Sequence, residues 1–241
     1  MNPLTGVLAE AWGLYRRFAR HFLTIAFVLY FLTAVVVALL SMTAGATGYL
    51  VAAVVEFVAA FLVQAAMVKA VQDVRDGRAD LSMDATISAG ARFLLPVAGA
   101  SILAAIGIGV GLVLLIVPGL ILMTYWSLIV PSIVAGETGA MASFGKSWRA
   151  VSGHFWQAFG TYVLVFLIWV AFDIALGLVL VTMPAALRSF LSSIIAGTLM
   201  APFYALVVTL VYYRLSEAHS GALPAATPPR NRFTEPPPAQ A

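Results

Sequence analysis

Six long apolar stretches, none containing lysine or arginine, divide the chain. They cover Phe22–Met42, Gly48–Val68, Leu94–Val117, Leu120–Gly136, Trp156–Met183 and Phe190–Tyr213. A helix of about 20 apolar residues crosses the hydrocarbon core of a bilayer. The stretches lack the alternation of apolar and polar residues that a membrane β-strand requires. With 62% apolar and only 10% charged residues, the chain also has too few charges to cover a soluble globule. We therefore predict an all-α polytopic membrane bundle of six transmembrane helices.

The cationic residues predict the orientation of this bundle. Of the thirteen lysines and arginines, Arg188 alone falls on the side of the membrane opposite to the others. The rest are Arg16, Arg17, Arg20, Lys69, Arg75, Arg78, Arg92, Lys146, Arg149, Arg214, Arg230 and Arg232. Because lysine and arginine are retained in the cytoplasm, we expect a multi-pass inner-membrane protein with cytoplasmic N- and C-termini.

An amphipathic segment precedes each outgoing span. Leu4–Phe22 and Met141–Phe155 place apolar residues at helical spacing beside cationic ones, and Met83–Phe93 is a weaker version. We expect these segments to be interfacial helices on the cytoplasmic side, with Trp12 and Trp148 at headgroup depth and their apolar neighbours facing the acyl chains.

The spans and amphipathic segments together form three similar units. Each would be a helical hairpin, with outer turns near Ala46, Pro118 and Ala186. Residues 1–220 would then be one membrane domain. Residues 221–241 hold many prolines and no apolar periodicity, and we predict a disordered cytoplasmic tail.

Three polar residues inside the spans form a candidate intramembrane site, Glu56, Gln64 and Asp173. No span contains a cation to neutralise the two acids, so we expect their carboxyl groups to be uncharged. Two interpretations remain open. The carboxyl groups could hold the bundle together by hydrogen bonds, or they could form the proton or cation site of a transporter.

Two further groups of residues are candidates for binding or packing. The lipid-headgroup candidates are Arg16, Arg17, Arg20, Lys146, Trp148 and Arg149, since cations beside aromatic residues suit an anionic membrane surface. A positive loop with an aromatic belt, which only fixes topology, explains the same residues. Gly107 and Gly111 have the four-residue spacing that lets membrane helices approach closely.

The order of several motifs resembles the membrane domain of bacterial glycerophosphoryl diester phosphodiesterases and its free-standing six-helix relatives. These motifs are Val117-Pro118-Gly119, Trp126, Pro131, Glu137, Lys146-Ser147-Trp148, Gly153-His154-Phe155-Trp156, Pro202 and Tyr212-Tyr213-Arg214-Leu215. Ser216 departs from the pattern, where a second arginine would be expected. In the fused members a separate soluble barrel carries out catalysis, and this chain has only three histidines and no comparable acid cluster. The resemblance thus implies a bacterial membrane domain without the enzyme.

These observations favour a non-catalytic bacterial inner-membrane protein, an envelope scaffold or lipid-associated module. No HExxH motif or Ser/His/Asp arrangement is present, and we expect neither cofactor nor metal. The expected partners are membrane lipids, including anionic headgroups, and not nucleic acid. The alternative is a proton- or cation-coupled transporter that uses Glu56 and Asp173. A packed bundle would favour the scaffold, and a polar cavity at mid-membrane would favour the transporter.

Overall fold

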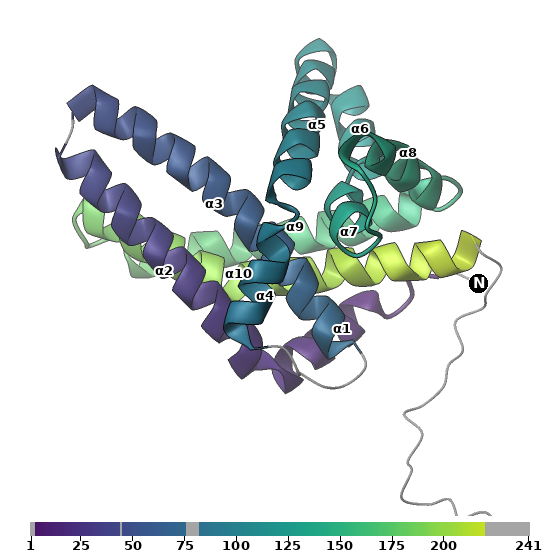
Figure 1. The fold of residues 1–241 in the computed structure, drawn as a ribbon, viewed down its shortest axis with the longest axis horizontal. Helices are drawn as coiled ribbons and strands as arrows, with labels where there is room; N and C mark the ends of the chain where they lie inside the picture. The colour runs from purple at the N-terminus through teal and green to yellow at the C-terminus, as the bar shows by residue number, and fades with distance from the viewer. Residues whose placement is uncertain (1–2, 44, 76–81, 220–241) are drawn as a thin grey trace, which may run out of the picture.

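The computed structural model describes residues 3–43, 45–75 and 82–219, and these residues form helices joined by short connections, with no strand among them (Figure 1). The helices are α1 Val7–Arg17, α2 Ala19–Thr43, α3 Gly45–Val74, α4 Met83–Ala91, α5 Leu94–Leu114, α6 Ile116–Tyr125, α7 Ile129–Val134, α8 Ala140–Val151, α9 Phe155–Val179 and α10 Ala185–His219. The predicted disordered tail, Arg78, Arg230 and Arg232 lie outside the described residues.

Six stretches of these helices are long and apolar enough to cross a membrane. They are Ala19–Leu40, Leu50–Val74, Leu94–Leu114, Ile116–Val134, Phe155–Val179 and Ala185–His219. Each overlaps one of the stretches expected from the sequence, so the all-α membrane-type fold is confirmed. The amphipathic segments before the outgoing spans are also helical, as α1, α4 and α8.

All three expected turns are displaced by a few residues. Pro118 and Gly119 lie inside α6, and the chain turns at Leu115, whose backbone is extended (φ −158°, ψ 137°). Proline is tolerated in the first turn of a helix because its missing N–H has no partner there. Ala186 similarly lies inside α10, which follows the turn that ends at Pro184. The third expected turn, near Ala46, also shifts, because α3 already begins at Gly45.

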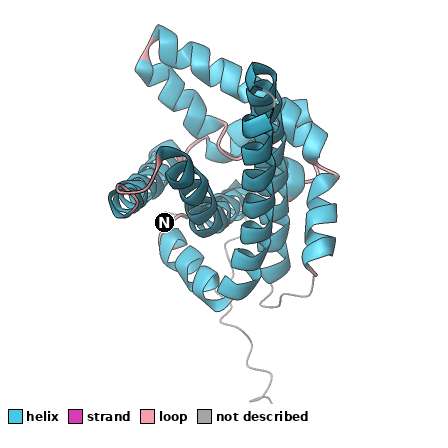
Figure 2. Cartoon of the chain, turned by 90° about the vertical axis from the view of Figure 1, so that its left-hand side faces the viewer, coloured by secondary structure: helices cyan, strands magenta, loops and turns pink. Residues whose placement is uncertain are grey.

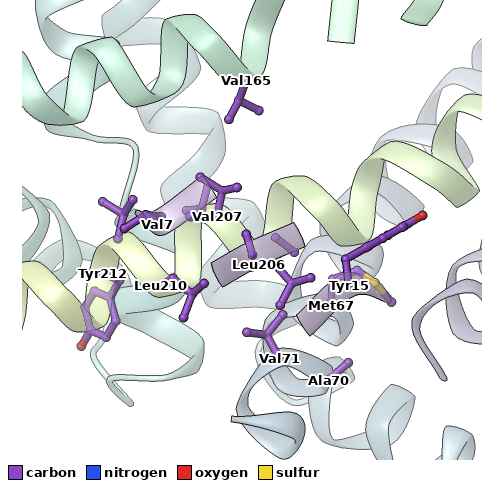
Figure 3. Close-up of a cluster of buried hydrophobic side chains, with 14 of the residues drawn as sticks. Val7, Tyr15, Met67, Ala70, Val71, Val165, Leu206, Val207, Leu210 and Tyr212 are labelled. Carbon is purple, nitrogen blue, oxygen red and sulfur yellow. The ribbon is translucent and has the colours of Figure 1, made fainter. Parts of the chain in front are cut away.

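The long helix α10 is the centre of the molecule. It packs against α1, α2, α3, α7, α8 and α9. Its half from Pro202 to Leu215 holds the main core, where Leu206, Val207 and Val211 are fully buried (Figure 3). The opposite half, towards Ala185, is more exposed. At 1.5 Å per residue its 35 residues extend about 52 Å, longer than a hydrocarbon core.

The remaining spans diverge from this centre. α2 packs against α3, and α5 against α6. The two pairs extend away from the core in different directions, and α9 lies beside α10 (Figures 1 and 2). Their outer parts expose large apolar side chains, including Leu50 (70% exposed) and Val113 (88% exposed). An apolar surface of this extent is compatible with lipid rather than water.

Candidate lipid-facing groove

α1 is attached to α10 by its apolar face. Val7, Ala11 and Tyr15 recur at four-residue intervals and are buried in the core that α10 shares with α1 (Figure 3). This corrects the expectation that the apolar neighbours of Trp12 face the acyl chains, because that face is covered by protein. Trp12 itself is 51% exposed.

Polar contacts fix α1 along α10. The Arg214 guanidinium donates hydrogen bonds to the carbonyls of Pro3 (3.2 Å) and Thr5 (2.7 Å) and forms an ion pair with Glu10. At the other end of α1, the Tyr15 hydroxyl donates to the carbonyl of Leu199 (3.1 Å). Burial raises the pKa of the Tyr15 phenol, so its proton remains available for this bond.

The Tyr15 contact falls at a weak point of α10. Pro202 lies inside that helix and has no N–H to donate to the carbonyl four residues earlier. Proline also loosens the adjoining turn, so nearby carbonyls gain from a donor on another helix. The hydroxyl of Tyr15 supplies such a donor to Leu199.

An apolar groove of about 560 Å³ lies between α1, α9 and α10. It is lined by Leu8, Ala9, Trp12 and Tyr15 of α1, Ile168 of α9, and Leu199, Met200 and Phe203 of α10. Trp12 stacks on Tyr15 with ring centroids 5.6 Å apart, and both rings meet the Phe203 ring edge-on. The wall of the groove is therefore apolar and includes three packed aromatic rings.

Three exposed arginines, Arg16, Arg17 and Arg20, lie at the C-terminal end of α1 and the start of α2. Arg16 follows Trp12 by four residues, so it lies on the groove side of α1, whereas Arg17 lies on the opposite side. Arg17 packs over the Phe18 ring, 5.3 Å from its centroid. Arg20 lies in the first turn of α2. None of the three forms a salt bridge with another described residue, and their charges remain available to an external anion.

Lys146 and Trp148 both contact other parts of the protein, and Trp148 is also 43% exposed. Lys146 Nζ donates to Thr138 Oγ1 (3.1 Å) and to the Gly136 carbonyl (3.4 Å). Trp148 stacks on Tyr125 with centroids 3.9 Å apart. Arg149 is exposed, and so remains available to lipid.

Ser147, which the sequence analysis did not single out as a site residue, supports a break in the fourth span. α6 ends at Tyr125 and α7 begins at Ile129, so this span is not one continuous helix. The buried Ser147 hydroxyl donates to the Tyr125 carbonyl (2.6 Å) and accepts from the Leu128 N–H (3.1 Å). One side chain of α8 thus satisfies backbone groups on both sides of the break.

The structure does not assemble the predicted intramembrane polar site. Glu56 and Gln64 lie on α3 and Asp173 on α9, and all three side chains are exposed. α3 packs against α2, α4, α5, α7 and α10, whereas α9 packs against α6 and α10. Within the described residues, Glu56 and Asp173 form no hydrogen bond or salt bridge. A shared acid site between these helices is therefore not formed.

Gly107 and Gly111 lie where α5 meets its neighbours. A Cβ atom at Gly107 would lie 2.5 Å from a ring atom of Trp126, and one at Gly111 would lie 3.0 Å from the Cα of Gly119. At both positions the neighbouring segment approaches too closely for a larger residue.

The C-terminal end of α10 gathers the cationic residues that the sequence analysis used only for topology. Arg75, which directly follows α3, forms a salt bridge with Glu217 (2.8 Å), and its guanidinium carbon lies 3.5 Å from the centroid of the Tyr213 ring. Gln72 Nε2 donates to the Tyr213 hydroxyl (3.2 Å). Arg75 and Arg214 therefore join α3 and α1 to α10. The sequence carries a signal in the Tyr212-Tyr213-Arg214 run, which follows a long apolar stretch and served the sequence analysis only for the family resemblance and the topology.

Comparison with known proteins gives one family. Residues 81–219 match the family described as Domain of unknown function (DUF7847). The match extends from α4 to α10 over more than half of the chain, so the chain belongs to this family. No curated protein and no solved structure matches it.

Proposed function

We propose that this member of the DUF7847 family is a non-catalytic, lipid-associated protein of the bacterial inner membrane, whose groove holds an anionic phospholipid. The observation that carries the proposal is the apolar groove between α1, α9 and α10, with the uncompensated Arg16 on the same side of α1. The acyl chain would lie against Trp12 and Phe203, and the phosphate beside the guanidinium of Arg16.

The charge, and not the groove, would select the lipid. An acyl chain gains little by leaving the bilayer for the groove, because both environments are apolar. A cation near the membrane surface contributes about 1 kcal/mol of attraction to anionic lipid. A phosphate oxygen within hydrogen-bond distance of a guanidinium adds a charge-assisted bond. We therefore expect a preference for anionic over zwitterionic headgroups that depends on Arg16.

The membrane arrangement forms part of the same proposal. The pairs α2–α3, α5–α6 and α9–α10 would be three hairpins inserted from the cytoplasmic side, with both termini in the cytoplasm. The main core around the second half of α10 would lie towards the cytoplasmic ends of the hairpins. The resemblance to the membrane domain of glycerophosphoryl diester phosphodiesterases supports a bacterial envelope role, and we propose this kinship on the quoted motifs alone.

Retention of lipid by purified variants tests the groove. The protein would be reconstituted in nanodiscs with equal phosphatidylglycerol and phosphatidylcholine, extracted gently, and examined by native mass spectrometry. We expect the parent and Arg17→Gln to retain phosphatidylglycerol preferentially and Arg16→Gln to lose the preference. The two variants remove the same charge from adjacent positions, so bulk electrostatics affects both equally. Equal retention by the two variants would contradict the proposal.

A transporter has less support from the geometry. Its predicted site would need Glu56 and Asp173 to share a polar cavity, yet both side chains are exposed on helices that do not pack extensively against each other. The apolar groove between α1, α9 and α10 is lined almost entirely by carbon atoms, so it is not a polar cavity. No observation favours ion coupling, and lipid association remains our proposal.

A further inference from the structure

Two exposed polar side chains on α3 need a partner in the membrane. Glu56 and Gln64 lie within the membrane-spanning stretch Leu50–Val74, and both face away from the protein. Ionisable residues in membrane spans are costly when they face lipid and nearly always point towards protein or a water-filled cavity. If α3 crosses a membrane, this face is covered by something other than acyl chains.

The polar residues belong to a face with small neighbours. At 100° per residue, Ala53, Glu56, Ala60 and Gln64 fall within an arc of about 80° on α3, and all four are exposed. We call this face the α3 stripe. The other exposed side of the same helix carries Val51, Val54 and Val58, which are 44%, 62% and 44% exposed, and the exposed Phe57 and Leu50 lie between the two sides. One side of α3 is thus suited to lipid and the other to a close helical contact.

We propose that the α3 stripe is the interface through which two copies of this chain associate in the membrane. Two copies inserted in the same orientation are related by a two-fold axis along the membrane normal, so each residue near the axis meets its own counterpart. Glu56 would face Glu56, Ala60 would face Ala60 and Gln64 would face Gln64.

The hydrogen-bonding capacity of the stripe favours a second copy over another partner. An uncharged carboxyl group and a side-chain amide each carry both a donor and an acceptor. Each can therefore pair with its own copy, and both polar positions are satisfied at once. Ala60 lies one turn from each polar residue, and its methyl side chain is small enough to let the backbones approach closely.

Disulfide trapping in native membranes tests the interface. The sequence contains no cysteine, so a single introduced cysteine gives an unambiguous signal. A disulfide needs the two Cα atoms about 4.4–6.8 Å apart. We expect Ala60→Cys to form a covalent homodimer under mild oxidation, and the exposed Val58→Cys on the same helix to remain monomeric. A monomeric Ala60→Cys, or equal cross-linking of both variants, overturns the proposal.

A second measurement tests whether the polar groups hold the dimer. In the Ala60→Cys background, Glu56→Gln keeps the hydrogen bonds and should leave cross-linking unchanged. Glu56→Leu with Gln64→Leu removes them and should abolish most of the covalent dimer, while leucine within a membrane span preserves insertion. Undiminished cross-linking in the leucine variant overturns the proposal. The result is independent of Arg16 and of lipid retention, so failure of one proposal leaves the other standing.

Discussion

At the scale of single residues, Ser147 bridges the break between α6 and α7 from a helix that follows it in the chain. Its hydroxyl contacts the Tyr125 carbonyl and the Leu128 N–H, and the side chain is fully buried. Lys146, beside it in sequence, contacts the Gly136 carbonyl and the Thr138 hydroxyl of the next connection. The adjacent pair thus stabilises the two irregular segments that flank α7.

Replacement of Ser147 by alanine should destabilise the protein. The variant leaves the buried Leu128 N–H and the part-buried Tyr125 carbonyl without this partner, and a buried group left unpaired costs about 1–3 kcal/mol. Thermal unfolding in detergent should show a lower melting temperature for Ser147→Ala. Ser152→Ala is the matched control, because Ser152 Oγ bonds only the Trp148 carbonyl of its own helix at an exposed site. Equal melting temperatures for the two variants would show that the Ser147 bonds contribute nothing measurable.

At the scale of elements, helix positions were easier to predict than the partners of each face. The spans and the helices before them follow from apolar periodicity, which the sequence carries locally. The same periodicity cannot show whether an apolar helix face contacts lipid or another part of the protein. Val7, Ala11 and Tyr15 form an apolar face of α1 that would suit acyl chains, yet this face packs against α10.

The break in the fourth span and the exposure of the polar residues were unpredictable for a related reason. Ser147 lies 19 residues from Leu128, so the backbone groups at the break find their partner only in the folded chain. A shared site of Glu56 and Asp173 requires their two spans to be neighbours. The apolar pattern of the two spans does not determine which helices are neighbours.

Two glycines of α5, Gly109 and Gly111, make the packing of this helix testable. A Cβ at Gly111 would meet the backbone of Gly119 on α6, whereas one at Gly109 would meet nothing within 4 Å. Gly111→Val should therefore force α5 and α6 apart and destabilise the protein by about 1–3 kcal/mol. Gly109→Val lies on the same helix and should leave the melting temperature nearly unchanged. A comparable loss in both variants would mean that valine acts through the helix itself and not through the contact with α6.

At the scale of the whole molecule, buried and exposed apolar surface are divided unequally. The core around α1, the ends of α2 and α3, and the second half of α10 is compact, and ion pairs Arg75–Glu217 and Arg214–Glu10 lie at its edge. The outer parts of the helix pairs are apolar and exposed. This division supports our proposal that the charged edge faces the cytoplasm and that lipid covers the outer parts of the helix pairs.

That orientation predicts which positions an impermeant thiol reagent can reach. Thr47 and Arg188 lie near the ends of the helix pairs remote from the ion pairs, and Asp84 and Ser152 lie beside the arginine-rich connections. Because the cationic segments resist translocation, Thr47→Cys and Arg188→Cys should react in intact cells. Asp84→Cys and Ser152→Cys should react only after the membrane is permeabilised. Labelling of Asp84→Cys in intact cells would reverse the orientation. It would also place the Arg16 side of the groove at the outer leaflet, so the lipid that reaches the groove would have to come from that leaflet.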